Sequence, residues 1–282
     1  MVEPLDRRLN VARPDLADIR LKGRVEAERF VEGVARRVAV PVAPLRRRPS
    51  ADAPLETEAL YGEDVAVFED DGEGWAFVQL AADNYVGYMP AEALALPDPA
   101  PTHRVAALRT FLFPGPDIKL PPRAGLCLGS RVAVREMGEK FALAAGGALF
   151  AGHLLPLDAP NESDFVTVAT RFLDTPYLWG GRSALGIDCS GLVQTALAAC
   201  GRTAPRDSDM QEAALGTALP LDAPLRRGDL LFWPGHVAIV EAPDTLLHAN
   251  AHAMCVAREP LVPALARIAA AGLPLRSIRR MA

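Results

Sequence analysis

The stretch YLWGGRSALGIDCSGLVQTALAACG, Tyr177–Gly201, decides the fold of the second half of the chain. A glycine-rich run leads to Cys189, and a mostly apolar segment follows. Apolar residues in this segment recur at the three- and four-residue spacing of one helix face, namely Leu192, Val193, Ala196, Leu197 and Cys200. Gly201 then supplies the residue type that most often ends a helix. The spacing therefore predicts a helix that starts at Cys189.

A thiol at a helix start has a distinctive chemistry. Unpaired backbone N–H groups there stabilise an anion, so we expect the pKa of Cys189 to lie below its ordinary value and favour a reactive thiolate. Cys200 falls on the apolar face, where a thiol is buried and inert. The two other cysteines, Cys127 and Cys255, are far apart and form no CxxC pair. This spacing argues against a metal cluster or a disulfide framework.

A cysteine nucleophile needs a base, and that base needs an orienting group. The segments DLLFW, HVAIV and TLLHAN are typical of consecutive strands separated by Pro-containing turns. His236 opens the second of these strands and His248 lies on the third, so adjacent antiparallel strands can bring the two rings into contact. His248 and His252 have the i, i+4 spacing of a helical metal site, but this segment is predicted as strand. We expect no metal and no cofactor.

Bulk composition narrows the functional classes. The 282 residues carry a net charge of −5, and half of them are hydrophobic. The short basic runs do not form the stripe that a nucleic-acid binder shows, so no nucleic-acid partner is expected. A run of about 18 apolar residues, as a membrane helix needs, does not occur. The first residues, MVEPLDRRLN, do not resemble a secretory signal, so we expect a soluble, cytoplasmic protein. The oligomeric state stays open.

Changes of pattern along the chain predict four parts in an α+β arrangement. Residues 1–35 are expected to form an arm packed on later domains, with a short helix within Asp15–Val34. Short strands separated by Gly, Asp and Asn turns predict a small β-barrel at 36–98 and a second, divergent one at 99–158. Residues 159–282 are predicted as an α+β unit, whose first helix is capped by Ser163.

Five motifs, DCSGLVQ, PRDSDMQ, RRGDLLFW, GHVAIV and LLHA, occur in this order within residues 160–282. Together they resemble the NlpC/P60 family of papain-like cysteine peptidases. The resemblance implies that Cys189 is the nucleophile, His236 the base and His248 the orienting residue. It also implies that the backbone N–H of Cys189 and the side chain of Tyr177 stabilise the oxyanion. One departure is Val240, where the family often has Tyr; we interpret this position as packing.

The first barrel segment, LETEALYGEDVAVFEDDGEGWAFVQLAADNYVGYMP, resembles bacterial SH3 (SH3b) domains, and the second is a weaker match. The whole chain is then similar to the dipeptidyl-peptidase VI type, a papain-like NlpC/P60 domain preceded by two SH3-like barrels. This resemblance implies hydrolysis of the γ-D-glutamyl–diamino acid bond through a thioester. The implied substrate is a free murein tripeptide or tetrapeptide with an N-terminal L-Ala, released during cell-wall recycling.

The same resemblance indicates substrate-binding residues. Glu63 and Tyr85 of the first barrel are candidates for reading the substrate's ammonium group, with Asp83 as the alternative to Glu63. Glu63 as a solvated turn residue and Tyr85 as a barrel core residue are the structural alternatives. On the catalytic side, five residues fall where the family lines its cleft: Trp179, Asp188, Ser190, Asp207 and Ser208. Asp207 and Ser208 could instead cap the helix that follows.

Three other functions stay open at this point. A CHAP-type amidase would cut the N-acetylmuramoyl–L-Ala link with a similar Cys/His pair. A non-catalytic protein could hold peptidoglycan through its SH3b domains, although Cys189 and His236 argue against it. An acyltransferase on the same papain-like core would carry the same motif. The diamino acid, and whether intact peptidoglycan is cut, stay undetermined.

Overall fold

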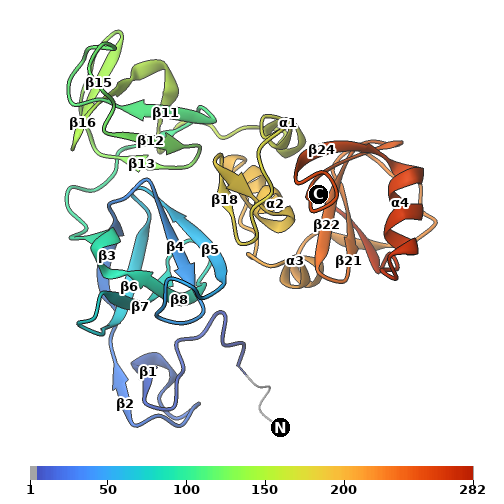
Figure 1. Cartoon of the computed structure of the whole chain (residues 1–282), viewed down its shortest axis with the longest axis horizontal. Helices are drawn as coiled ribbons and strands as arrows, with labels where there is room; N and C mark the ends of the chain where they lie inside the picture. Colours follow the sequence, from blue (N-terminus) through green and yellow to red (C-terminus); the bar gives the residue numbers. More distant parts are fainter. Residues whose placement is uncertain (1–4, 282) are drawn as a thin grey trace. The chain divides into compact units, whose positions relative to one another are not determined.

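The computed structural model describes residues 5–281 and divides the chain into two compact units, Met1–Ala159 and Pro160–Ala282. Strands and helices combine in the α+β class that the sequence predicts (Figure 1). The division lies one residue from the predicted start of the last domain. The finer bounds at residues 36 and 99 stay a prediction, and residues 1–4 of the predicted arm lie outside the described residues. Within residues 5–281, no helix has the length and apolar character needed to span a membrane.

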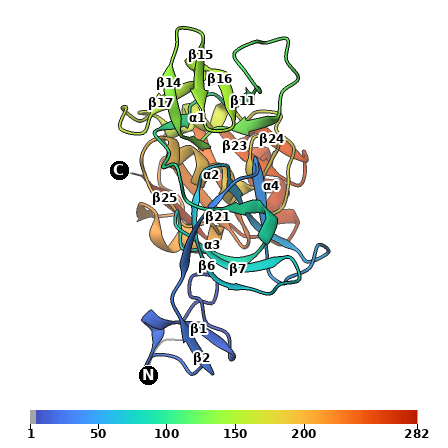
Figure 2. The ribbon, with the colours of Figure 1, turned by 90° about the vertical axis from the view of Figure 1, so that its left-hand side faces the viewer.

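The arm differs from the prediction of a helix within Asp15–Val34. It contains β1 (Leu16–Asp18), the 3₁₀ turn η1 (Ile19–Leu21) and β2 (Arg29–Val31), and the two strands pair in parallel. Asp18 caps the start of η1, where its side chain accepts from Arg20 N, and the non-helical backbone of Lys22 ends the turn after three residues. Val11 and Leu16 pack against Phe68 and neighbouring apolar residues of the first barrel. The prediction that the arm packs on the barrel is thus confirmed (Figure 2).

A seven-stranded sheet in the order β5-β4-β8-β7-β6-β3-β9 forms the first barrel. Its elements are β3 (Val34–Val38), β4 (Val42–Arg46), β5 (Leu55–Leu60), β6 (Asp64–Asp70), β7 (Trp75–Leu80), β8 (Val86–Pro90), η2 (Ala91–Ala93) and β9 (Leu94–Ala95). The Asp/Gly-rich segment after β6 makes the predicted tight turn, in which the carboxylate of Asp71 accepts from the backbone N–H groups of Glu73 and Trp75.

Smaller sheets build the rest of the first unit. Its elements are β10 (His103–Val105), β11 (Arg109–Leu112), β12 (Ala124–Cys127), β13 (Arg131–Val132), β14 (Val134–Met137), β15 (Phe141–Ala144), β16 (Gly147–Phe150), η3 (Ala151–His153) and β17 (Leu154–Pro156). They enclose their own apolar core, which includes Leu126 and Leu149. Tyr61 from the first barrel packs on this core, and its carbonyl accepts from Arg131 N at 2.8 Å.

The second unit is built around a six-stranded sheet in the order β20-β25-β21-β22-β23-β24, beside the small pair β18-β19. The strands are β18 (Arg182–Ser183), β19 (Gly186–Ile187), β20 (Thr217–Leu219), β21 (Asp229–Trp233), β22 (His236–Ala242), β23 (Thr245–Asn250), β24 (Cys255–Pro260) and β25 (Ser277–Arg280). The three predicted strands correspond to β21, β22 and β23, which pair antiparallel as consecutive neighbours.

Four helices accompany this sheet within the described residues: α1 (Phe165–Thr170), α2 (Cys189–Ala199), α3 (Ser208–Ala214) and α4 (Leu261–Ala270). Figure 1 shows the sheet between α2 and α4. The cap of α1 is Asp164, whose side chain accepts from Val166 N, so the predicted cap at Ser163 was wrong by one residue. Val240 is fully buried against the α4 face, which confirms its interpretation as packing.

Candidate active site

Cys189 is the first residue of α2, as the sequence predicts. Asp188 precedes the helix as its N-cap and accepts from the backbone N–H of Gly191 at 2.7 Å. Position 191 has room only for glycine, because a Cβ atom there would lie 2.4 Å from the carbonyl oxygen of Gly181. The motif DCSG therefore combines a cap, a thiol at the helix start and a glycine that lets the glycine-rich loop approach closely.

The thiol faces the start of β22. Backbone N–H groups of Val237 and Ser190 hydrogen-bond to the sulfur, and Val237 is the residue directly after His236. Tyr177 is half-buried, and burial, followed by the charge of Cys189, raises the pKa of its hydroxyl. The structure thus brings together the nucleophile, base and oxyanion candidates that the sequence indicates for this unit.

The two predicted histidines are in contact. His236 Nε2 lies 2.9 Å from His248 Nδ1, and His248 is almost fully buried on β23. The ring of Trp233 packs at 5.6 Å, between centroids, against the ring of His236. His252 follows β23 in a turn, so it does not share a helix face with His248.

One sequence expectation about the thiol is wrong. Burial, followed by the neighbouring charge of Asp188, raises the pKa of Cys189 to about 12 instead of lowering it. Burial, followed by His248, lowers the pKa of His236 to about 3. A lone charge on either group is therefore disfavoured. Proton transfer from thiol to imidazole forms both charges together, and opposite charges at short range stabilise each other, so neither shift argues against base-assisted attack.

Stability toward acid follows from the same burial. Since the folded-state pKa of His236 lies near 3, below its ordinary value of 6.5, the unfolded chain binds protons more readily. The free energy of unfolding therefore has its full value above about pH 6.5 and decreases as the pH drops toward 3. We expect His236→Gln to flatten this fall between about pH 6.5 and 4.5. Urea unfolding of both proteins at a series of pH values tests this, and parallel pH curves would contradict it.

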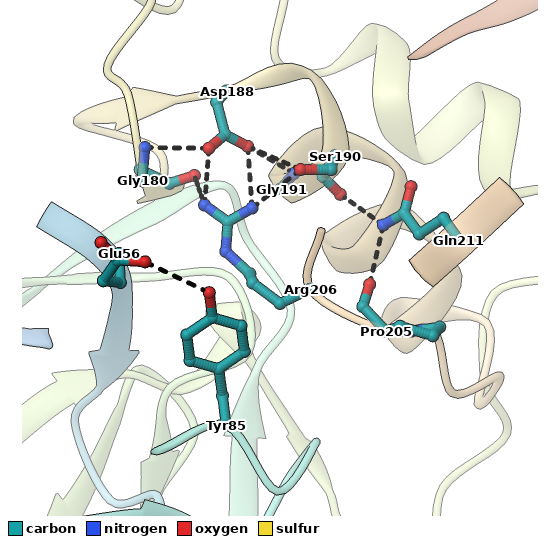
Figure 3. Close-up of polar contacts among 10 residues, drawn as sticks. Glu56, Tyr85, Gly180, Asp188, Ser190, Gly191, Pro205, Arg206 and Gln211 are labelled. Atoms are coloured by element: carbon teal, nitrogen blue, oxygen red, sulfur yellow. Dashed lines mark hydrogen bonds and ion pairs between the residues drawn. The ribbon is translucent and has the colours of Figure 1, made fainter. Parts of the chain in front are cut away.

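A buried ion pair supports the loop and helix around Cys189 (Figure 3). Arg206 donates to both carboxylate oxygens of Asp188, at 2.9 and 2.7 Å, and its side chain is only 1% exposed. It also donates to Ser190 Oγ at 2.9 Å and to the carbonyl of Gly181 at 3.2 Å. Asp188 in turn accepts from Gly180 N at 2.9 Å.

The predicted cleft residues of this unit occupy different environments. Asp188 and Ser190 are buried in the Arg206 network, whereas Trp179 is 65% exposed. Asp207 and Ser208 are half-buried at the start of α3. Asp207 is the N-cap by position, but its side chain makes no capping hydrogen bond. Gln211 of α3 donates to the carbonyl of Ser190 at 2.9 Å, which ties α3 to the start of α2.

Glu63 and Tyr85 lie in the first unit, within the first barrel. Glu63 is buried, and its carboxylate accepts from the backbone N–H of Leu60 at 2.9 Å. Tyr85 is buried, and its hydroxyl donates to Glu56 Oε2 at 3.5 Å (Figure 3). Asp83 accepts from Tyr85 N at 3.0 Å. Contact of Glu63 or Tyr85 with a substrate stays a prediction.

Sequence reasoning missed four residues that the structure brings out: Glu56 beside Tyr85, Arg206 on Asp188, and the pair Glu259–Arg267, in which Glu259 lies 3.1 Å from His248. A single Arg between Pro205 and Asp207 carries no sign that it is buried. Arg267 lies on α4, a helix that was not predicted. Its signal was present, because apolar residues recur there at helical spacing, as Leu261, Ala264, Leu265 and Ile268.

Family models match both units of the chain. The model described as bacterial dipeptidyl-peptidase Sh3 domain matches residues 45–94, and the NlpC/P60 family model matches residues 174–261.

Relatives and solved structures agree with these matches. Dipeptidyl-peptidase 6 of Lysinibacillus sphaericus is 29% identical over 74% of this chain and 85% of its own length. Gamma-D-glutamyl-L-lysine dipeptidyl-peptidase of Bacillus subtilis is 30% identical over 64% and 65%. A crystal structure of an NlpC/P60 family protein from Bacillus cereus shares the fold with a TM-score of 0.75, at 22% identity over 88% of this chain and 99% of that chain. On these matches, residues 174–261 carry an NlpC/P60 domain, and residues 45–94 carry a bacterial dipeptidyl-peptidase SH3 domain.

Proposed function

We propose that this protein is a cysteine peptidase that hydrolyses the γ-D-glutamyl–diamino acid bond of murein peptides with an N-terminal L-Ala. The observation that carries the proposal is the helix-start thiol of Cys189, which accepts from the N–H of the residue after His236, together with the His236–His248 contact. Two relatives support the substrate class, since one is named dipeptidyl-peptidase 6 and another gamma-D-glutamyl-L-lysine dipeptidyl-peptidase. A cytoplasmic location and a role in recycling stay predictions.

The proposed reaction proceeds by acyl transfer in two steps. The sulfur of Cys189 attacks the γ-glutamyl carbonyl while His236 takes the thiol proton. The tetrahedral intermediate collapses to a thioester, and His236 returns the proton to the departing amine of the diamino acid. Water, deprotonated by His236, then attacks the thioester, and the thiol is restored as the L-Ala-D-Glu product leaves.

In this reaction the surroundings of Cys189 have separate tasks. Backbone N–H groups already directed at the sulfur, from Val237 and Ser190, stabilise negative charge on it. The hydroxyl of Tyr177, whose pKa the charge of Cys189 helps to raise, is the donor assigned to the oxyanion. The Asp188–Arg206 pair fixes the backbone around the thiol without contacting the reacting atoms.

The test is product identification by mass spectrometry. The purified protein is incubated with L-Ala-γ-D-Glu-meso-diaminopimelate and, separately, with the lysine analogue. Release of L-Ala-D-Glu together with the free diamino acid is the expected result. A matched peptide acetylated at the N-terminus should lose most of its kcat/KM, because acetylation removes the charge that the proposed specificity requires.

Other outcomes point to other functions. Cleavage of N-acetylmuramoyl–L-Ala in an intact muropeptide, with no cut at the γ-glutamyl bond, would instead favour an amidase. Equal rates for free and acetylated peptide would remove the amine requirement while leaving the bond assignment intact. If the free amine is preferred, a Tyr85→Phe variant tests the role of the first barrel. An unchanged preference in this variant would exclude the Tyr85 hydroxyl as the group that recognises the amine.

A further inference from the structure

We propose that Glu259, held by Arg267, is a positioning residue that sets the tautomers of His248 and His236. The inference rests on the proposed function, because it assigns how the base of that reaction is prepared. His248 Nε2 lies 3.1 Å from Glu259 Oε2, on the ring side opposite to His236. Hydrogen-bonded side chains thus form a continuous row from β22 through β23 and β24 to α4.

Strand register explains why these side chains meet. His248 pairs with Ala257 of β24, and Glu259 stands two residues further along, on the same face of the sheet. In β22, Ile239 pairs with Leu247, which puts residue 238 opposite His248 and residue 236 on the same face. Diagonal neighbours at this offset lie within reach of long side chains. The row is thus a direct product of the antiparallel pairing.

Arg267 makes Glu259 an obligate acceptor. It donates from Nε to Oε1 at 2.9 Å and from Nη2 to Oε2 at 2.7 Å. Hydrogen bonding to Arg267 lowers the pKa of Glu259, so the carboxyl group stays ionised. An ionised carboxylate accepts hydrogen bonds and donates none.

The proton positions follow in sequence from that carboxylate. His248 Nε2 must carry the proton that Glu259 accepts. Burial lowers the pKa of His248, so its ring is neutral and its Nδ1 has no proton. His236 Nε2 must then donate to that bare nitrogen. Since the ring of His236 is also neutral, its Nδ1 is unprotonated and available as a base.

Without the carboxylate, both rings can exchange tautomers together. His248 would carry its proton on Nδ1 and donate it to His236 Nε2, and the proton of His236 would sit on Nδ1. This form has the same number of protons and an intact hydrogen bond between the rings, but it leaves His236 without a free base. A wrong tautomer in a nucleophile–base–acid system costs catalysis without disturbing the geometry.

The chain offers a matched control on the same sheet. Glu241 and Arg258 form a bidentate ion pair, with bonds of 2.6 and 2.8 Å, that resembles the Glu259–Arg267 pair. The contacts of Glu241 include no histidine among the described residues. Charged or titratable groups near His248 are His236, Glu259, Arg267 and His252. Replacing Glu241 or Arg258 therefore removes an equivalent pair and leaves this set untouched.

The experiment compares Glu259→Leu with Glu241→Leu in the full chain. For Glu259→Leu we expect kcat to fall by about 10- to 100-fold with KM nearly unchanged. Glu259→Gln should recover much of the rate, because its amide oxygen can still accept from His248. Nitrogen NMR of labelled histidine rings reads the tautomers directly, and the chain has only five histidines. His248 should show a protonated Nε2 in the wild type and a protonated Nδ1 in Glu259→Leu.

A second variant keeps the test decisive if Glu259→Leu does not fold. In Arg267→Met the pKa of Glu259 rises, so protonation of the carboxyl group begins at higher pH, and a protonated carboxyl can donate to His248. The acid limb of kcat should move to higher pH, whereas Arg258→Met should leave it in place. A merely structural role would lower thermal stability and leave the tautomers unchanged. The charge of Arg267 also lowers the pKa of His236 directly, so the limb is interpreted together with the tautomers of the same variant.

Two results would overturn the proposal: wild-type tautomers in Glu259→Leu, or an acid limb that does not move in Arg267→Met. The NMR measurement needs no substrate, so its outcome is independent of the proposed function. If the wild type hydrolyses none of the murein peptides, the proposed function fails while the tautomer assignment still stands or falls by the spectra.

Discussion

Cys189→Ala is expected to lower kcat for the γ-glutamyl bond by about 10⁴- to 10⁶-fold, the range seen when a covalent nucleophile is removed. The thiol is the group that forms the acyl-enzyme in the proposed mechanism, and the backbone N–H groups of Val237 and Ser190 are directed at it. Alanine at this position keeps the helix start and removes a single sulfur atom. Binding of the peptide should therefore survive while turnover is lost.

The matched control is Cys200→Ala, at the other end of α2. Cys200 follows the last residue of α2 and is half-buried, so the prediction that it is buried on the helix face was wrong. Its removal should leave kcat close to the wild-type value. Rapid-quench analysis of the wild type should also trap a thioester on Cys189 that is absent from the variant. Turnover by Cys189→Ala within tenfold of the wild type would exclude the covalent mechanism.

The features that could be predicted from the sequence are those that depend on residues close together in the chain. The start of α2 at Cys189 and the meeting of His236 with His248 depend on helix periodicity and on adjacent hairpin strands, both of which are local patterns. The sequence therefore predicts the nucleophile and its base. Contact between the two histidines was predicted without knowing which residues of the strands pair. The structure gives this pairing, which also places Glu259 beside His248.

What the sequence did not predict depends on burial. Periodicity indicates which face of a helix is apolar, but not that the thiol of Cys189 itself is buried, so the direction of its pKa shift was wrong. Arg206 is charged, and charged side chains are rarely buried unless paired. Its partner Asp188 is eighteen positions away, and no spacing rule links a loop arginine to a helix cap. Such a pair becomes visible only when tertiary structure brings the two segments together.

Loss of the Arg206–Asp188 ion pair is expected to have the largest effect on stability. Arg206→Met should lower the free energy of unfolding of the second unit by about 3–5 kcal/mol, as when one member of a buried ion pair is removed. The carboxylate of Asp188 would stay buried without its bidentate donor, and Ser190 Oγ and the Gly181 carbonyl would each lose a hydrogen bond. Methionine keeps much of the side-chain volume, so a cavity contributes little.

A second helix of the same unit provides the comparison. Asp164 caps α1 as Asp188 caps α2, and Arg227 donates to Asp164 at 2.7 Å. There the two side chains are 44% and 40% exposed, against 1% and 10% for Arg206 and Asp188. Arg227→Met should therefore cost only about 0–1 kcal/mol.

Urea unfolding of the full chain, in a Trp75→Phe, Trp179→Phe background that leaves buried Trp233 as the fluorescent reporter, measures both variants on the unit that holds them. Similar losses for Arg206→Met and Arg227→Met would mean that burial does not set the strength of this pair. A large loss for Arg206→Met alone would instead show that the loop around Cys189 is held by a charge that cannot be solvated. The position of the proposed nucleophile would then depend on that ion pair as much as on its place at the helix start.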